Sequence, residues 1–164
     1  RLGIALNYNS YGLRVADLHV APDALYRQMA PFADPLEFAR QPLPRELWKN
    51  YRTDIARAEG TQPLLEAPAA AALRLPAEPW AQRIAGPLGN RLAQASRDRA
   101  HAVLVANGDG SLRVSLRAPL EAPEGAGALC ARFGGGGRPK AAGIDALPDE
   151  ELAVFLEAFR AAYR

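Results

Sequence analysis

The chain has 164 residues, and its 20 basic and 18 acidic side chains leave a net charge of +2. This near balance excludes a protein that coats nucleic acid by charge alone, and 49% hydrophobic residues are typical of an ordinary globular protein. Cys130 is the only cysteine, which excludes an internal disulfide and any multi-cysteine zinc site. No apolar run approaches the roughly 20 residues that span a membrane, so we expect no membrane segment. A cytoplasmic location is expected, and the single cysteine is compatible with it.

The chain starts at Arg1 without a methionine, inside a run in which Leu2, Ile4 and Leu6 alternate with other residues. This alternation predicts a short strand over residues 1–8. The start inside an apolar run, without a methionine, also suggests that the chain is part of a longer protein.

The first third of the chain predicts short helices separated by prolines. One covers residues 22–29 and a second residues 34–39, each with a proline at its start. Pro42 and Pro44 are expected to interrupt the chain before an amphipathic helix over residues 45–59. The apolar stripe of that helix is Leu47, Trp48, Tyr51 and Ile55.

Residues 61–70 contain two prolines and four alanines and are interpreted as a linker or crossing segment. Leu73 and Leu75 then indicate a strand. A helix is expected to start at Gly86-Pro87, because a proline disfavours continuity with the turn that carries Trp80 and Ile84.

A β-hairpin is the clearest local pattern. Residues 100–106 form a compact apolar run, and residues 111–118 alternate apolar with polar side chains. The turn sequence Asn107-Gly108-Asp109-Gly110 joins them.

Two further strands are expected on either side of a glycine run, over residues 129–133 and 142–146. Residues 147–151 then open a final helix through a proline and three acids. Its buried stripe is Leu152, Phe155, Leu156, Phe159 and Tyr163.

These patterns predict an α/β protein, with a mixed β-sheet and packed helices in the C-terminal part and a mostly helical linker region before it. Residues 1–63 are expected to be the end of an N-terminal domain with its helical linker. Residues 64–164 are expected to form the α/β domain.

The glycine run Gly134-Gly135-Gly136-Gly137 is the first candidate for a binding site. Consecutive glycines allow tight backbone turns with exposed N–H groups, which can form a concave nest for anions. Arg138 and Lys140 follow directly and add two cations. A phosphate or carboxylate would suit such a loop, and the alternative is an ordinary surface turn.

Three segments together resemble a known arrangement. They are Arg113-Val114-Ser115-Leu116-Arg117, then Phe133 with the glycine run, then Ala141-Ala142-Gly143-Ile144 before the last helix. Residues 71–164 resemble the C-terminal substrate-binding domain of the DHH phosphoesterases, the family of RecJ-type nucleases, nano-RNA phosphatases and cyclic-dinucleotide phosphodiesterases. The helical first part is similar to the segment that joins the two domains of such proteins.

The resemblance implies a substrate site without catalytic or metal-binding residues in this chain. Ser115, Arg117, the four glycines, Arg138 and Lys140 would grip a phosphate. An Asp-His-His domain with divalent metal, usually Mn²⁺, would precede Arg1, so no cofactor is expected in the chain itself, which would be inactive alone. Many family members have His where Arg138 stands; Arg can donate to phosphate but cannot relay a proton near neutral pH.

The expected ligand is a phosphorylated nucleotide or a short oligonucleotide, bound by part of a metal-dependent phosphoesterase. The alternative is a nucleic-acid (tRNA) binding module, because residues 135–139 also resemble a Gly-Gly-Gly-Arg-Pro loop in the C-terminal domain of alanyl-tRNA synthetases. A third interpretation is a domain that supports oligomerisation, with a homodimer formed through the parent protein.

The remaining chemistry-bearing residues are interpreted as structural. His101 lies in a core-like strand, and Cys130 is expected to be an inert buried thiol. His19 lies near Asp17 and could support a site in the full-length protein. Trp48 and Tyr51 are interpreted as packing residues that could also stack on a base.

Overall fold

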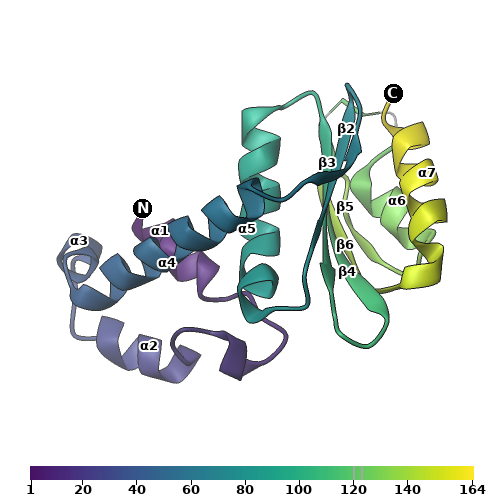
Figure 1. Cartoon of the computed structure of the whole chain (residues 1–164). Helices are drawn as coiled ribbons and strands as arrows, with labels where there is room; N and C mark the ends of the chain where they lie inside the picture. The colour runs from purple at the N-terminus through teal and green to yellow at the C-terminus, as the bar shows by residue number, and fades with distance from the viewer. Residues whose placement is uncertain (120, 123) are drawn as a thin grey trace. The chain divides into compact units, whose positions relative to one another are not determined.

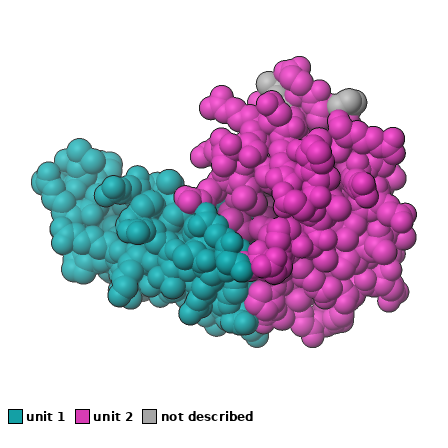
Figure 2. Space-filling model, turned by 45° about the horizontal axis from the view of Figure 1, so that its top comes forward, with its two compact units in different colours: residues 1–60, 78–87 teal, residues 61–77, 88–164 magenta. Residues whose placement is uncertain are grey.

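The computed structural model describes residues 1–119, 121–122 and 124–164. The chain forms two compact units, shown in different colours in Figure 2: residues 1–60 with 78–87, and residues 61–77 with 88–164. The sequence analysis divided the chain after residue 63 into the end of an N-terminal domain with its linker and an α/β domain. That division stays a prediction. In the part of the chain that the structure describes, no helix is long and apolar enough to cross a membrane.

The first unit is helical (Figure 1). Its elements are α1 (Leu2–Tyr8), the 3₁₀ turn η1 (Val15–Asp17), α2 (Pro22–Met29), α3 (Pro35–Ala39), α4 (Pro42–Glu59) and the first part of α5 (Pro79–Ala95). The predicted helices over residues 22–29 and 34–39 are confirmed. Asp34 caps α3 by accepting a hydrogen bond from the Leu36 N–H.

The predicted strand over residues 1–8 is wrong, because this segment is helix α1. Ala5 and Tyr8, three residues apart, are buried, whereas Ile4 is 46% exposed. The buried residues therefore follow the helical period, and α1 packs against α4. Alternation over only three apolar residues could not distinguish the two periods.

Pro42 and Pro44 open α4, so the prediction that they interrupt the chain is wrong. A proline in the first helical turn loses no hydrogen bond, because the N–H groups there have no acceptor within the helix. The predicted stripe is confirmed for Leu47, Tyr51 and Ile55, which are buried, whereas Trp48 is only half-buried.

A new helix does not start at Gly86-Pro87. Helix α5 runs unbroken through Pro87, so Trp80, Ile84 and the later turns belong to one element. A proline inside a helix costs roughly 3 kcal/mol. Burial of the side chains on both sides of it, including Ile84 and Leu88, offsets that cost.

The second unit is built on a six-stranded sheet of order β1-β2-β3-β4-β6-β5. Its strands are β1 (Pro63–Glu66), β2 (Ala70–Leu75), β3 (Ala100–Ala106), β4 (Ser111–Arg117), β5 (Gly136–Arg138) and β6 (Ala141–Pro148). Strands β2 and β3 pair in parallel and all other neighbours antiparallel. The predicted α/β fold with a mixed sheet is confirmed, as is the hairpin of β3 and β4.

Two local predictions in this unit are wrong. The supposed linker contains β1, an edge strand in which Pro63 is tolerated because it is the first residue. Residues 129–133, which were expected to form a strand, instead form the end of helix α6 (Ala126–Ala131) and the turn after it. Ala126, Leu129 and Cys130 are buried at helical spacing, which a window starting at Leu129 could not reveal.

The core of the second unit lies on one face of the sheet, under α6 and α7 (Leu152–Ala162), as Figure 1 shows. Phe155 and Phe159 are fully buried, and Leu152 and Leu156 pack against the same cluster, so the predicted stripe of the last helix is confirmed. The acids at 149–151 form a 3₁₀ turn, η2 (Asp149–Glu151), ahead of α7.

Candidate anion-binding site

Strand β4 divides its side chains between the two faces of the sheet. Leu112, Val114 and Leu116 are buried in the core, while Ser115 and Arg117 face the opposite side and are partly exposed. This is the two-residue period of a strand whose two faces meet different surroundings. Ser115 and Arg117, the two site residues predicted on β4, therefore lie outside the core.

The register of three strands places four of the predicted site residues in two adjacent rows. Ser115 lies opposite Gly143 of β6, and Gly143 lies opposite Gly136 of β5. Arg117 lies opposite Ala141, which in turn lies opposite Arg138. Directly paired residues share a face, so one row carries two arginines and the other a serine and two glycines.

Arg117 is held in place by its neighbours. Its Nε–H donates to Oδ1 of Asn90 at 2.8 Å, and one terminal nitrogen donates to Ser115 Oγ at 3.1 Å and to the Leu116 carbonyl at 3.0 Å. Asn90 lies on α5 next to Gly89, where an added Cβ would lie 3.5 Å from Arg117 Cγ. The guanidinium is thus oriented before any ligand arrives, which lowers the entropic cost of binding.

The row beside Arg117 is open because glycines replace side chains there. A Cβ at Gly136 would meet nothing within 4 Å, whereas a Cβ at Gly143 would approach the Val114 carbonyl oxygen to 2.9 Å. Between Ser115 and the sheet edge this row therefore carries only bare backbone, and we call it the open lane. A ligand could lie close to the backbone in that lane.

The glycine run serves two structural purposes. Gly134, with φ of +74°, ends α6: its N–H donates to the Ala131 carbonyl and the Gly135 N–H to the Cys130 carbonyl. This pairing is the Schellman motif at a helix C-terminus. Gly136 and Gly137 instead begin the edge strand β5. The N–H groups of Gly134 and Gly135 are therefore occupied, and the run is not an open nest of four donors.

Arg138 and Lys140 are exposed, and they lie at the end of β5 and in the turn that leads to β6. The Lys140 carbonyl accepts a hydrogen bond from the Ala118 N–H at 3.1 Å, which ties this turn to the end of β4. The structure thus brings Ser115, Arg117, Gly136 and Arg138 to one face, with Lys140 at its margin. Gly134 and Gly135 do not join them.

Asn90 was missed at the sequence level. It lies 27 residues before Arg117, in a helix whose start was placed by Pro87, and no local pattern marks it. The one sequence signal for Asn90 was the glycine before it, Gly89, because a glycine inside a helix often marks a close approach by another element. Gly143 was quoted as part of a motif, but its place in the open lane depends on strand register.

His101 lies in the same row as Arg117, on β3. Its side chain is 3% exposed. Burial lowers the pKa of the His101 imidazole, and the neighbouring Arg99 guanidinium lowers it further. The neutral ring is the stable form, which fits the structural role expected from the sequence. Cys130 is likewise fully buried, and burial raises the pKa of its thiol to about 11.

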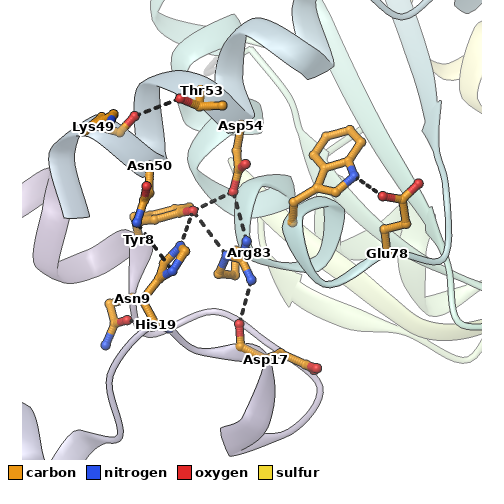
Figure 3. A network of polar contacts seen from close by, with 11 residues as sticks. Tyr8, Asn9, Asp17, His19, Lys49, Asn50, Thr53, Asp54, Glu78 and Arg83 are labelled. Carbon is orange, nitrogen blue, oxygen red and sulfur yellow. Dashed lines mark hydrogen bonds and ion pairs between the residues drawn. The ribbon is translucent and has the colours of Figure 1, made fainter. Parts of the chain in front are cut away.

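A second polar cluster lies within the first unit (Figure 3). The Tyr8 hydroxyl donates to Asp54 Oδ2 at 2.5 Å and contacts Nε2 of His19 at 2.8 Å. Arg83 donates from Nε to the same hydroxyl at 3.1 Å and from another nitrogen to Asp54 at 3.2 Å. Asp54 and Tyr8 are almost completely buried.

The geometry of this cluster fixes its protons. Because the Tyr8 proton goes to Asp54, the tyrosine oxygen accepts from His19, which must carry its proton on Nε2. Nδ1 of His19 then accepts from the Asn50 amide at 3.4 Å. Burial and the bond to Asp54 raise the pKa of Tyr8 far above its usual value. The Tyr8 hydroxyl therefore stays protonated. It stabilises the first unit through its hydrogen bonds and does not act as a general base.

Within the residues that the structure describes, no group of three or more His, Cys, Asp or Glu side chains could hold a metal ion. Asp17 does not form one with His19: its carboxylate accepts from the N–H groups of Leu13 and Arg14 in the turn before η1.

Nearly the whole chain shares its fold with a portion of DHH-family proteins. RecJ from Thermus thermophilus, solved in complex with Mn²⁺, superposes with a TM-score of 0.62 at 21% identity, over 98% of this chain and 23% of RecJ. PggH of Vibrio cholerae, a pGpG-specific phosphodiesterase, superposes at 0.55 with 11% identity, over 96% of this chain and 55% of PggH.

The DHH domain of a protein from a family of ribosomal proteins is similar as well, with a TM-score of 0.60 and 10% identity, over 98% of this chain and 40% of that protein. This chain therefore spans between about a quarter and just over half of these proteins. At such identities the likeness is one of fold. Neither the scan against protein-family models nor the search of curated proteins gives a match.

Proposed function

We propose that this chain is the substrate-binding portion of a metal-dependent phosphoesterase that acts on phosphorylated nucleotides or short oligonucleotides. The observation that carries the proposal is the row of Arg117 and Arg138 beside the open lane of Ser115, Gly143 and Gly136. The fold it shares with part of RecJ and PggH supports the reaction class.

In this proposal the chain binds and orients its substrate. The guanidinium of Arg117, oriented by Asn90 and Ser115, donates to phosphate oxygens of the ligand. Arg138 approaches from the sheet edge. Rigid placement of a phosphoryl group is itself a large share of phosphoryl-transfer catalysis. The described residues contain no group of side chains that could hold a metal ion. We therefore propose that the divalent metal, Mn²⁺, is bound by another domain of a longer protein. No step in this chain is assigned to it.

The proposal is tested by calorimetric titration of the chain with a 5′-phosphorylated dinucleotide and with the same dinucleotide lacking the 5′-phosphate. We expect weak binding without turnover, and preference for the phosphorylated form. A hydrogen bond to a charged group contributes roughly 1.5–3 kcal/mol, so Arg117→Ala and Arg138→Ala should each weaken binding about 10- to 100-fold.

Two variants act as controls. Arg97→Ala removes the same charge from an exposed position outside the face, and we expect it to bind like the parent. Arg117→Lys should recover part of the loss, since an ammonium keeps the charge but cannot reproduce the hydrogen bonds to Asn90 and Ser115 that orient the guanidinium. Binding that ignores the 5′-phosphate, or that survives loss of Arg117, would refute the proposal. A steep salt dependence across many phosphates would favour the nucleic-acid binding module instead.

A further inference from the structure

Helix α4 carries a second concentration of positive charge, in the first unit. We define the α4 basic face as Arg45, Lys49, Arg52 and Arg57, with the short side chains of Thr53 and Ala56 among them. Arg45, Lys49 and Arg52 are spaced by four and three residues, which places them on one side of a helix. All four cations are exposed, whereas Leu47, Tyr51 and Ile55 on the other side are buried.

Cations outnumber acids on this face. In the described part of the chain, Arg45, Lys49 and Arg52 take part in no ion pair. The central acid of the helix, Asp54, is turned to the buried side and paired with Arg83, as Figure 3 shows. The other acids of α4, Glu46 and Glu59, are exposed, so the four cations of the face stand against at most two exposed acids of the helix. The face therefore presents several cations along about 18 Å of helix axis, at 1.5 Å per residue.

The same face is hollowed and carries an aromatic ring. A surface hollow of about 640 Å³ is lined by Trp48, Lys49, Arg52, Thr53, Ala56 and Arg57. The Trp48 ring stacks on Tyr51 with centroids 5.3 Å apart, and the Arg1 guanidinium lies 5.9 Å from its centroid. A planar ring among cations can contact a base while the cations contact phosphates.

We propose that the α4 basic face binds a single-stranded oligonucleotide through its phosphate chain, with Trp48 against a base. Guanidinium groups match phosphate geometry, and a face of this length can meet successive phosphates of one strand. A membrane surface is disfavoured, because the apolar side of α4 is buried and a membrane-binding helix must expose it. The α4 basic face belongs to the first unit and the sheet face to the second, and the inference does not depend on the proposed function.

The test uses the intact chain and a fluorescein-labelled single-stranded dodecamer, followed by anisotropy. Lys49→Glu with Arg52→Glu is compared with Arg40→Glu and Arg97→Glu, a control pair that changes the same charge at exposed positions elsewhere. The first pair should weaken binding at least about tenfold, and the control less than about twofold. The slope of log K against log salt should fall by roughly 1.4, or about 0.7 per lost phosphate contact.

A second readout locates the strand. The chain has two tryptophans, so Trp80→Phe leaves Trp48 as the sole reporter. We expect the oligonucleotide to change Trp48 emission, and this change should persist when Arg117→Ala removes the main cation of the sheet face.

Three results would each overturn the inference: equal binding by the two charge-reversed pairs, unchanged Trp48 emission at saturation, or equally tight binding of polyglutamate. Binding to vesicles with anionic lipid at the same affinity would also overturn it, by assigning the face to a membrane. Circular dichroism of each variant confirms that the fold is intact. Loss of dinucleotide binding by Arg117→Ala with oligonucleotide binding retained would separate the two sites.

Discussion

Arg117 and Arg138 lie opposite the same residue, Ala141, from its two sides. Ala141 is on β6, between the strands that carry the two arginines. Neighbouring strands are about 4.8 Å apart, so the two arginine Cα atoms are separated by about 10 Å. Their long side chains can converge on one phosphoryl group or hold two consecutive ones, across the small side chain of Ala141.

The glycines of the 134–137 run differ in what a side chain would meet, and this gives a first prediction. A Cβ at Gly136 meets nothing within 4 Å, so Gly136→Val should fold normally and place a branched side chain in the open lane. We expect dinucleotide binding to weaken about tenfold or more. Titration calorimetry checks the affinity.

Gly137→Val is the matched variant for stability. Gly137 has φ of +145°, and its Cβ would approach the Ala142 Cα to 2.5 Å. The strained backbone alone costs roughly 1–3 kcal/mol, so this variant should lower the unfolding midpoint in urea, whereas Gly136→Val should not. If Gly136→Val binds the dinucleotide like the parent, the lane is no part of the site.

The buried Tyr8 hydroxyl gives a second prediction. Tyr8→Phe leaves Asp54, Arg83 and His19 each without one hydrogen-bond partner. Leaving buried polar groups unsatisfied costs about 1–3 kcal/mol. Thermal unfolding followed by circular dichroism should show a lower midpoint. Tyr26→Phe, at a position that is 70% exposed, should leave the midpoint unchanged, and equal midpoints for both variants would contradict the structural role of the cluster.

Helix α7 gives a third prediction, on the core of the second unit. Phe155 is fully buried and stacks against Phe159 with ring centroids 6.0 Å apart. Phe155→Ala should lower the free energy of unfolding by roughly 3–5 kcal/mol. The neighbouring Val154 is 58% exposed, and Val154→Ala should change it by less than about 0.5 kcal/mol. Urea denaturation of both variants measures the difference, and similar values would show that α7 does not close the core.

The two histidines give a fourth prediction, on pH. Burial lowers the pKa of both His19 and His101 below the unfolded value of 6.5, helped by Arg83 and Arg99 respectively. The fold therefore favours the neutral rings. The stability they contribute is complete above the unfolded pKa and is lost as the pH falls through the lower folded values. Asp54 and Glu46 near His19, and Glu66 near His101, act in the opposite direction.

Urea midpoints measured at about pH 7.5 and about pH 5 should therefore fall toward acid. His101→Gln should flatten that fall more than His19→Gln, because His101 is almost completely buried, whereas His19 is only partly shielded from solvent. A fall that is the same in the parent and in His101→Gln would show that carboxylates, not this histidine, govern acid sensitivity.

Local patterns in the sequence determined those helices and strands whose spacing of apolar residues matches the face that the fold buries. The β3–β4 hairpin, the stripe of α7 and the proline-led helices α2 and α3 were predicted, because their turn residues and apolar spacing point to the same answer. The resemblance to part of a DHH phosphoesterase rested on the order of short motifs, and the fold agrees with it. Ser115 and Arg117 were placed outside the core by alternation alone.

Tertiary structure decided what depends on partners far away in the chain. Residues 1–8 became a helix because α4 supplies a surface for Ala5 and Tyr8, and burial along α5 outweighed the cost of Pro87. The glycine run was divided between a helix cap and an edge strand, because α6 ends at its first half and β6 pairs with its second. Strand register and the contact of Asn90 with Arg117 join segments that are distant in the chain, and no local propensity encodes such pairings.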